Sequence, residues 1–172
     1  MIAWSEGARM NEFSVAKRIK ALLQAKLWSG GNSPVFGDVL VTAGVSMEAY
    51  KSQLRWPFVL ILVGNIEADD DAADLAVARF TVKMAQRVAG DNYGESAVIG
   101  GPSPSNLVSD ARGILDLQTA LFDTIQLLTV QDGVRIQWIS SSAIGATIDE
   151  DHGYIVERDY EFEAWVGLGS NP

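Results

Sequence analysis

Two segments of the chain carry apolar residues at the spacing of an amphipathic helix. In the first, Asn11 or Ser14 can cap the helix and Ser29-Gly30-Gly31 ends it, and the apolar stripe comprises Val15, Ile19, Leu22, Leu23 and Leu27. In the second, Ser109 or Asp110 provides the cap, and the stripe comprises Ile114, Leu117, Leu121, Ile125 and Leu128. Each stripe covers one side of its helix, so we expect both helices to pack on a sheet.

Other segments have the patterns of strands. Residues 58–63 are continuously apolar and branched, which predicts a strand covered on both faces at the centre of the sheet. Residues 78–84 alternate, so one face is buried and Arg79, Thr81 and Lys83 lie on a wet or interfacial face. A short strand at 134–138 follows the turn signal Gln131-Asp132-Gly133. Residues 154–166 alternate for longest and predict a final strand with one polar face, formed by Glu157, Asp159, Glu161 and Glu163.

The order of these elements predicts the fold class. Short extended pieces at 35–41 and a helical turn at 47–55 add to the strands and helices. We expect an α+β fold, a mainly antiparallel sheet with two amphipathic helices packed on one face. A length of 172 residues fits one domain, 1–172, in which 1–10 are an N-terminal extension. Residues 89–109 are rich in glycine and proline and predict a long loop that meets a partner.

Composition excludes several classes of function. The net charge of −9 opposes binding to a phosphate backbone or to anionic lipid. The absence of cysteine removes disulfides and thiolate nucleophiles, and fits synthesis in a reducing compartment. The start of the chain lacks the pattern of a signal peptide, and the longest apolar run, 57–63, is far below the ~20 residues that cross a bilayer. We therefore expect no membrane partner and no tightly held nucleic acid.

The sequence offers only weak evidence for a catalytic or metal-binding site. His152, the only histidine, lies in a charged turn, 149–153, and is interpreted as an exposed turn residue. A calcium site at Asp69, Asp70, Asp71 and Asp74 lacks the glycine and the distal glutamate of a calcium loop, which favours a solvated loop. The glycines of 89–109 lack the spacing of a phosphate-binding motif. We expect no enzyme, no cofactor and no metal.

The four acids of the final strand have two interpretations. Carboxylates two residues apart could form a catalytic pair, but an acidic ladder that meets Arg79 and Lys83 on a neighbouring strand is the simpler hypothesis. Such a ladder could also line a channel and repel DNA that passes through it.

The order and texture of the elements resemble the tail terminator family of long-tailed bacteriophages, of the lambda type. The segments that carry the resemblance, within Asn11 to Leu168, are the first helix, Trp56-Pro57-Phe58-Val59-Leu60, Arg79-Phe80-Thr81-Val82-Lys83, Arg112-Gly113-Ile114-Leu115-Asp116 and the aromatic strand Tyr154 to Phe162. The resemblance implies a homohexameric ring in the virion neck, made in the host cytoplasm. It implies as partners the tail tube protein and the head connector or stopper protein, with genomic DNA only passing through the channel, and neither cofactor nor active site.

A candidate subunit or partner interface follows from the charged residues. Arg158 lies between Val156 and Tyr160 on the apolar face of the final strand, where a lone arginine is costly to bury, so we expect it at a subunit boundary. The full set of candidates is Arg158, Tyr160, Asp69, Asp70, Asp71, Arg79 and Lys83. Two alternatives remain open: another neck protein, such as a head-completion or stopper protein, and a cytoplasmic ligand-binding module.

Overall fold

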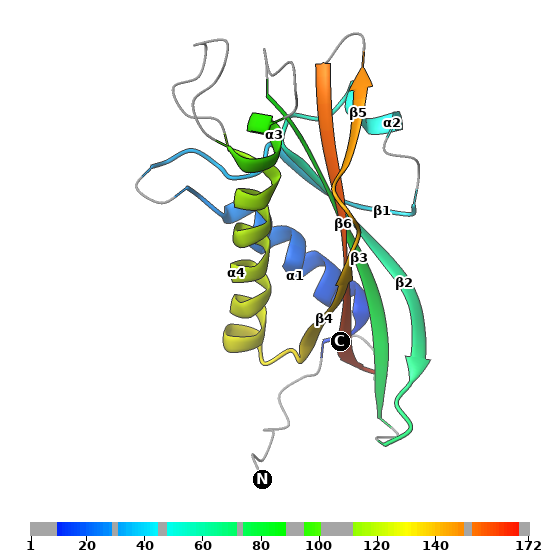
Figure 1. Ribbon diagram of the computed structural model, residues 1–172. Coiled ribbons are helices and arrows are strands. Elements are labelled where there is room, and N and C mark those ends of the chain that lie inside the picture. Colours follow the sequence, from blue (N-terminus) through cyan, green and yellow to red (C-terminus); the bar gives the residue numbers. More distant parts are fainter. Residues whose placement is uncertain are drawn as a thin grey trace.

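The computed structural model describes residues 10–28, 31–44, 48–71, 74–88, 95–100, 112–149 and 153–168. The elements follow one another as α1 (Glu12–Ala25), β1 (Asp38–Thr42), α2 (Glu48–Lys51), β2 (Phe58–Ala68), β3 (Leu75–Arg87), α3 (Glu95–Ile99), α4 (Ile114–Asp132), β4 (Ile136–Ser141), β5 (Gly145–Asp149) and β6 (Gly153–Gly167). The strands form a single sheet, and the long helices α1 and α4 lie beside it (Figure 1).

The sheet confirms the predicted α+β class. Its order is β1-β2-β3-β6-β4, and β5 also pairs with β6. Only the β1–β2 pair is parallel; the other four pairs between the described strands are antiparallel. The predicted central position of the apolar strand 58–63 is wrong, because β3 occupies the middle of the order. The residues Phe58, Val59, Leu60 and Ile61 are instead apolar because both faces of β2 are covered there.

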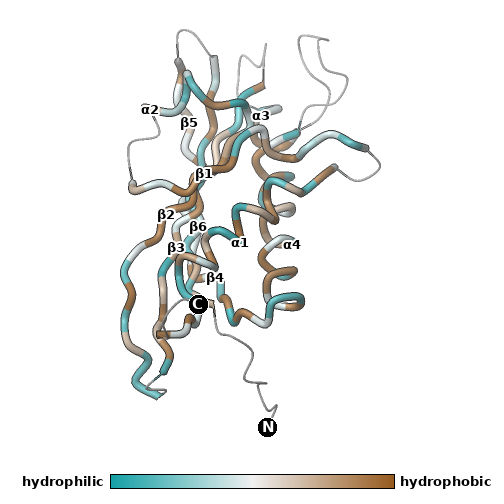
Figure 2. Tube along the Cα trace, turned by 180° about the vertical axis from the view of Figure 1, so that it is seen from behind, coloured by the Kyte–Doolittle hydropathy of each residue, from teal (hydrophilic) through white to brown (hydrophobic). Residues whose placement is uncertain are grey.

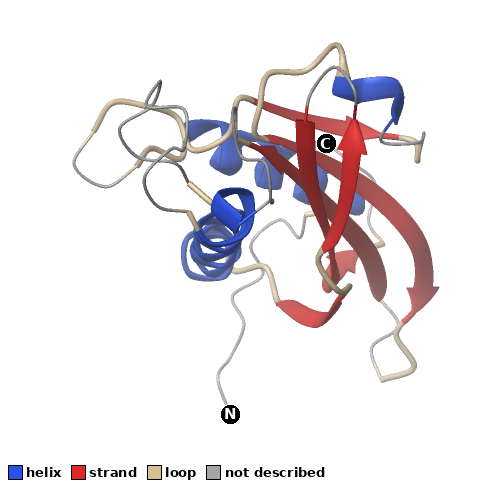
Figure 3. Ribbon diagram, turned by 45° about the horizontal axis from the view of Figure 1, so that its top comes forward, coloured by secondary structure: helices blue, strands red, loops and turns tan. Residues whose placement is uncertain are grey.

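The main core lies between the sheet and the helices α1 and α4, which cover the same face (Figure 3). The predicted stripe of α4 is buried throughout, and it packs on the inward residues of β3 and β6: Ala78, Phe80, Val82, Met84, Tyr160, Phe162, Ala164 and Val166. Asn11 caps α1 as predicted, since its side-chain oxygen accepts from the amide of Ser14 at 2.9 Å. The alternation of apolar and polar residues therefore predicted correctly which face of β3 and of β6 lies in the core.

The two long helices lie on one face of the sheet as expected, and the opposite face is covered in part. Phe58, Leu60 and Ala85 form a second small core, against which Tyr50, Leu54 and Trp56 pack from α2 and the turns that follow it. The Arg55 side chain and backbone amide donate to Asp38, and these bonds hold the pKa of the Asp38 carboxyl below its usual range.

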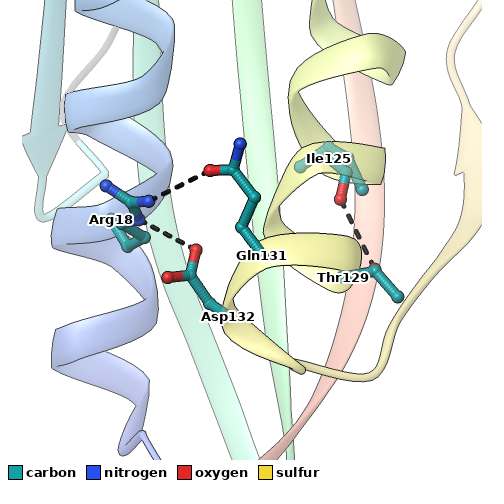
Figure 4. A network of polar contacts seen from close by, with 5 residues as sticks. All are labelled: Arg18, Ile125, Thr129, Gln131 and Asp132. Carbon is teal, nitrogen blue, oxygen red and sulfur yellow. Dashed lines mark hydrogen bonds and ion pairs between the residues drawn. The ribbon is translucent and has the colours of Figure 1, made fainter.

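Polar contacts tie α1 to α4 along their exposed sides. The Arg18 guanidinium donates to Asp132 at 2.8 Å and to Gln131 at 3.4 Å (Figure 4). Lys26 pairs with Asp123 at 3.1 Å, nearer the other end of both helices. Surface pairs of this kind contribute about 0.2–1 kcal/mol each, so apolar burial, not charge, holds the helices on the sheet.

Four segments differ from the prediction. Helix α1 ends at Ala25, so Leu27 of its predicted apolar stripe lies beyond the helix and is exposed. The segment 89–109 contains the helix α3, whose Ala97 is buried; 89–94 and 101–109 lie outside the described residues. Helix α4 is capped by Gly113, whose amide donates to Asp116 at 3.0 Å, while the predicted caps Ser109 and Asp110 lie outside the described residues. Strand β5 was not predicted, because its alternating part, Ala146 to Asp149, is only four residues long and contains only two apolar residues.

Candidate assembly interface

The four acids of the final strand have partners within the chain. Register places Arg79 opposite Glu163 and Lys83 opposite Asp159, and both pairs form ion pairs, the first at 3.2 Å. Lys51 of α2 lies 3.1 Å from Glu157, and the hydroxyl of Ser140 donates to Glu161 at 2.9 Å. The predicted meeting of the acidic ladder with Arg79 and Lys83 is confirmed, and the polar face of the sheet is a paired surface instead of an uncompensated acidic one.

A second charged feature is the hairpin between β2 and β3. This hairpin extends past the ends of the long helices (Figure 1), and the part farthest from them is hydrophilic (Figure 2). Asp70 and Asp71 are exposed, and the Asp69 side chain accepts from the amide of Asp71 at 2.9 Å, which orders the turn. Asp70 and Asp71 therefore lie where another molecule can reach them, which agrees with a solvated loop.

Arg158 and Tyr160 are engaged within their own chain. The Arg158 guanidinium donates to the Gln118 side chain, the Ser142 carbonyl and the Ser141 hydroxyl, at 2.9, 3.0 and 2.9 Å. Tyr160 is buried, and its hydroxyl donates to Gln118 at 3.1 Å. Burial raises the pKa of the Tyr160 hydroxyl to about 12, against a smaller lowering by Arg158. Their role at a subunit boundary stays a prediction, and the exposed backbone offers a more direct surface.

That surface is the free edge of the sheet at β2. Strand β1 pairs with β2 only from Phe58 to Leu62. Beyond that point β2 continues to Ala68 with β3 on one side and, among the described strands, nothing on the other. Val63 and Ile66 are exposed along this free half. An unpaired edge with apolar side chains is a template for another strand.

The opposite edge of the sheet is formed by β4 and β5. Both strands pair with β6 on one side only within the described residues. Trp138 and Ile139 of β4 and Ile148 of β5 are exposed there. The Trp138 ring packs edge-on against Phe122 of α4, and its indole N–H donates to the Ser140 carbonyl at 2.8 Å, so the ring is held in place while half of it faces solvent.

Sequence patterns did not reveal these edges. Ile66 and Trp138 look like inward residues of alternating strands, and their exposure depends on which strand lies next to them. The sequence contains one hint of free edges, which is an absence. Neither 63–68 nor 136–141 contains the lysine or proline that commonly protects an edge strand from pairing.

Other candidate chemistry is limited. In the described part of the chain, no group of three or more histidine, aspartate or glutamate side chains is placed to hold a metal ion, and no helix is long and apolar enough to cross a membrane. His152 lies outside the described residues. No model of a known protein family matches the sequence, and no curated protein matches it.

Proposed function

We propose that this chain is a structural protein of a tailed-phage virion, which forms a ring that caps the tail tube, ends its polymerisation and joins the tail to the head connector. The observation that carries the proposal is the pair of free sheet edges on opposite sides of one copy, at β2 and at β4. A head-to-tail repeat that joins the free half of β2 to β4 pairs these two edge segments in every copy of a closed ring. The number of six copies comes from the resemblance to tail terminators.

The charge of the chain agrees with this role. The net charge of −9 opposes binding to a phosphate backbone, and in the described part of the chain Arg79, Lys83 and Lys51 are paired with the acidic ladder. DNA that passes through a ring of this protein is then not retained. The exposed acids Asp70 and Asp71 on the hairpin are available to a basic surface of a neighbouring copy or of a virion partner.

The test is the mass of the purified protein in solution, followed by its effect on tail tubes. We expect a ring at six times the monomer mass of 18.6 kDa, either alone or with the tail tube protein of the same virion. Added to growing tubes, the protein should stop elongation and be seen at one tube end by electron microscopy. A ring that binds the head connector but leaves tube growth unchanged would identify another neck protein. A lasting monomer that binds a small molecule would favour the ligand-binding module.

A further inference from the structure

The backbone direction at the free half of β2 is fixed by its pairing with β3. The amide of Asp69 donates to the Leu75 carbonyl at 3.1 Å. Hydrogen-bonded and non-hydrogen-bonded pairs alternate in an antiparallel ladder, so Glu67 also directs its backbone groups toward β3. Ile66 and Ala68 direct theirs away from β3, toward the free edge.

The same argument applies to β4. The amide of Trp165 in β6 donates to the Arg135 carbonyl at 2.9 Å. Gln137, two residues further on, therefore faces β6, whereas Ile136 and Trp138 present their backbone groups to the outside. Each edge thus offers two residues whose amides and carbonyls lack a strand partner within the described chain.

We propose that the free half of β2 in one copy pairs antiparallel with β4 of a second copy, so that Ile66 lies opposite Trp138 and Ala68 opposite Ile136. The inference deepens the proposed ring and rests on it. In this register the outward backbone groups of both edges meet as hydrogen-bonded pairs. The sheet of one copy then continues into the next.

Side chains agree with the register. Ile66 lies opposite Ala78 and Trp138 lies opposite Phe162, and both of these partners belong to the core under the helices. Ile66 and Trp138 therefore point to the same face of a joined sheet. They are 43% and 50% exposed in one copy, and pairing would bury them against each other.

Charge and strand irregularity agree as well. The register places Asp69 opposite Arg135, whose guanidinium stacks 3.9 Å above the ring of Trp165. The pairing register of each strand shifts once. In β2 the shift lies between Val63 and Ile66, and in β4 it lies between Trp138 and Ser140. The proposed register brings these two irregular stretches together, whereas a shift by two residues separates them.

Disulfide trapping tests the register, because the chain has no cysteine. Glu67→Cys with Gln137→Cys places two thiols at a non-hydrogen-bonded pair across the interface, about 4.5 Å apart at Cα, within disulfide range. Strands β3 and β6 lie between these residues in one copy, so a bond forms only between copies. We expect a reducible ladder of covalent oligomers up to the closed ring, with at least about tenfold more product than from the control pairs.

The controls separate the alternatives. Glu67→Cys with Arg135→Cys or with Ile139→Cys reports a shift by two residues, and Glu67→Cys with Thr147→Cys reports pairing to β5. A control pair that links faster overturns the proposed register or strand. Rings of native mass without any link overturn this interface but leave the proposed ring standing, and a parent protein that stays monomeric with its tail tube protein overturns both.

A second variant checks the same contact without oxidation. Ile66 is exposed in one copy, so Ile66→Asp should keep the circular dichroism and melting temperature of the parent monomer while it abolishes assembly. Val130→Asp, a change at an exposed apolar residue of α4, is the matched control and should assemble normally. Normal assembly of Ile66→Asp would overturn the proposal.

Discussion

Three nitrogens of Arg158 donate to oxygens of its own chain, on α4, at the last residue of β4 and on the residue that follows it. Arg158→Glu removes these donors and places a carboxylate beside the Gln118 and Ser142 oxygens. We expect the free energy of unfolding to fall by about 1–3 kcal/mol, measured by urea titration. Arg158→Lys, which keeps the charge and one donor, should lose less. Unchanged stability of Arg158→Glu, together with lost assembly, would instead support the boundary role predicted from the sequence.

Tyr160 makes stability depend on alkaline pH. Its pKa is raised from 10.0 to about 12 in the folded chain, so the folded state holds the proton more tightly than the unfolded state does. The stabilisation is fully present below about pH 10 and is lost as pH rises toward 12. Tyr160→Phe should therefore melt with a weaker pH dependence than the parent between pH 10 and 12. Parallel melting curves for both proteins across this range would contradict the assignment.

At the scale of elements, the contact between α3 and the start of α4 depends on a glycine. A Cβ atom built on Gly113 would overlap the carbonyl oxygen of Val98 and the amide nitrogen of Gly100. Gly113→Ala should therefore displace α3 and cost about 1–3 kcal/mol, seen as a lower melting temperature. Gly145→Ala is the control, since its nearest neighbour would lie at 3.9 Å. Equal melting of both variants would show that α3 does not pack closely on α4.

The elements that could be predicted are those whose pattern is local. Helices α1 and α4 and strands β3 and β6 follow from periodicity, because each buries one continuous face over ten or more residues. Strand β5 could not be predicted, since its strand character comes from pairing with β6. The position of β2 was predicted wrongly. An apolar run indicates that both faces of a strand are covered, but it does not indicate where the strand lies in the order of the sheet.

At the scale of the whole molecule, one part of the candidate interface could be predicted from the sequence and another part could not. The facing of Arg79 and Lys83 toward the acidic ladder could be predicted, because strand alternation fixes the face of each side chain. The free edges could not, since the register Asp38 to Thr42 against Phe58 to Leu62 decides where β1 leaves β2 unpaired. An unpaired strand edge can be recognised only when the order and register of the strands are known.

Asp69 and Arg135 provide the last prediction, because the proposed joined sheet places them opposite each other across two copies. Asp69→Asn keeps the oxygen that accepts from Asp71 and removes only the charge. Arg135→Gln removes the opposing charge. For an exposed pair worth about 0.2–1 kcal/mol, each change should lower the association constant by about 1.5- to 5-fold at low salt and less at high salt.

The double variant decides whether these two charges meet. If they pair, Asp69→Asn together with Arg135→Gln should weaken association no more than the stronger single change, since the second change removes a partner that is already lost. Sedimentation of the four proteins at matched concentration gives the coupling, and Glu95→Gln, on the exposed start of α3, controls for net charge. Strictly additive losses would show that Asp69 and Arg135 do not interact, and would contradict the electrostatic part of the proposed interface. The disulfide between cysteines at positions 67 and 137 tests the backbone pairing independently.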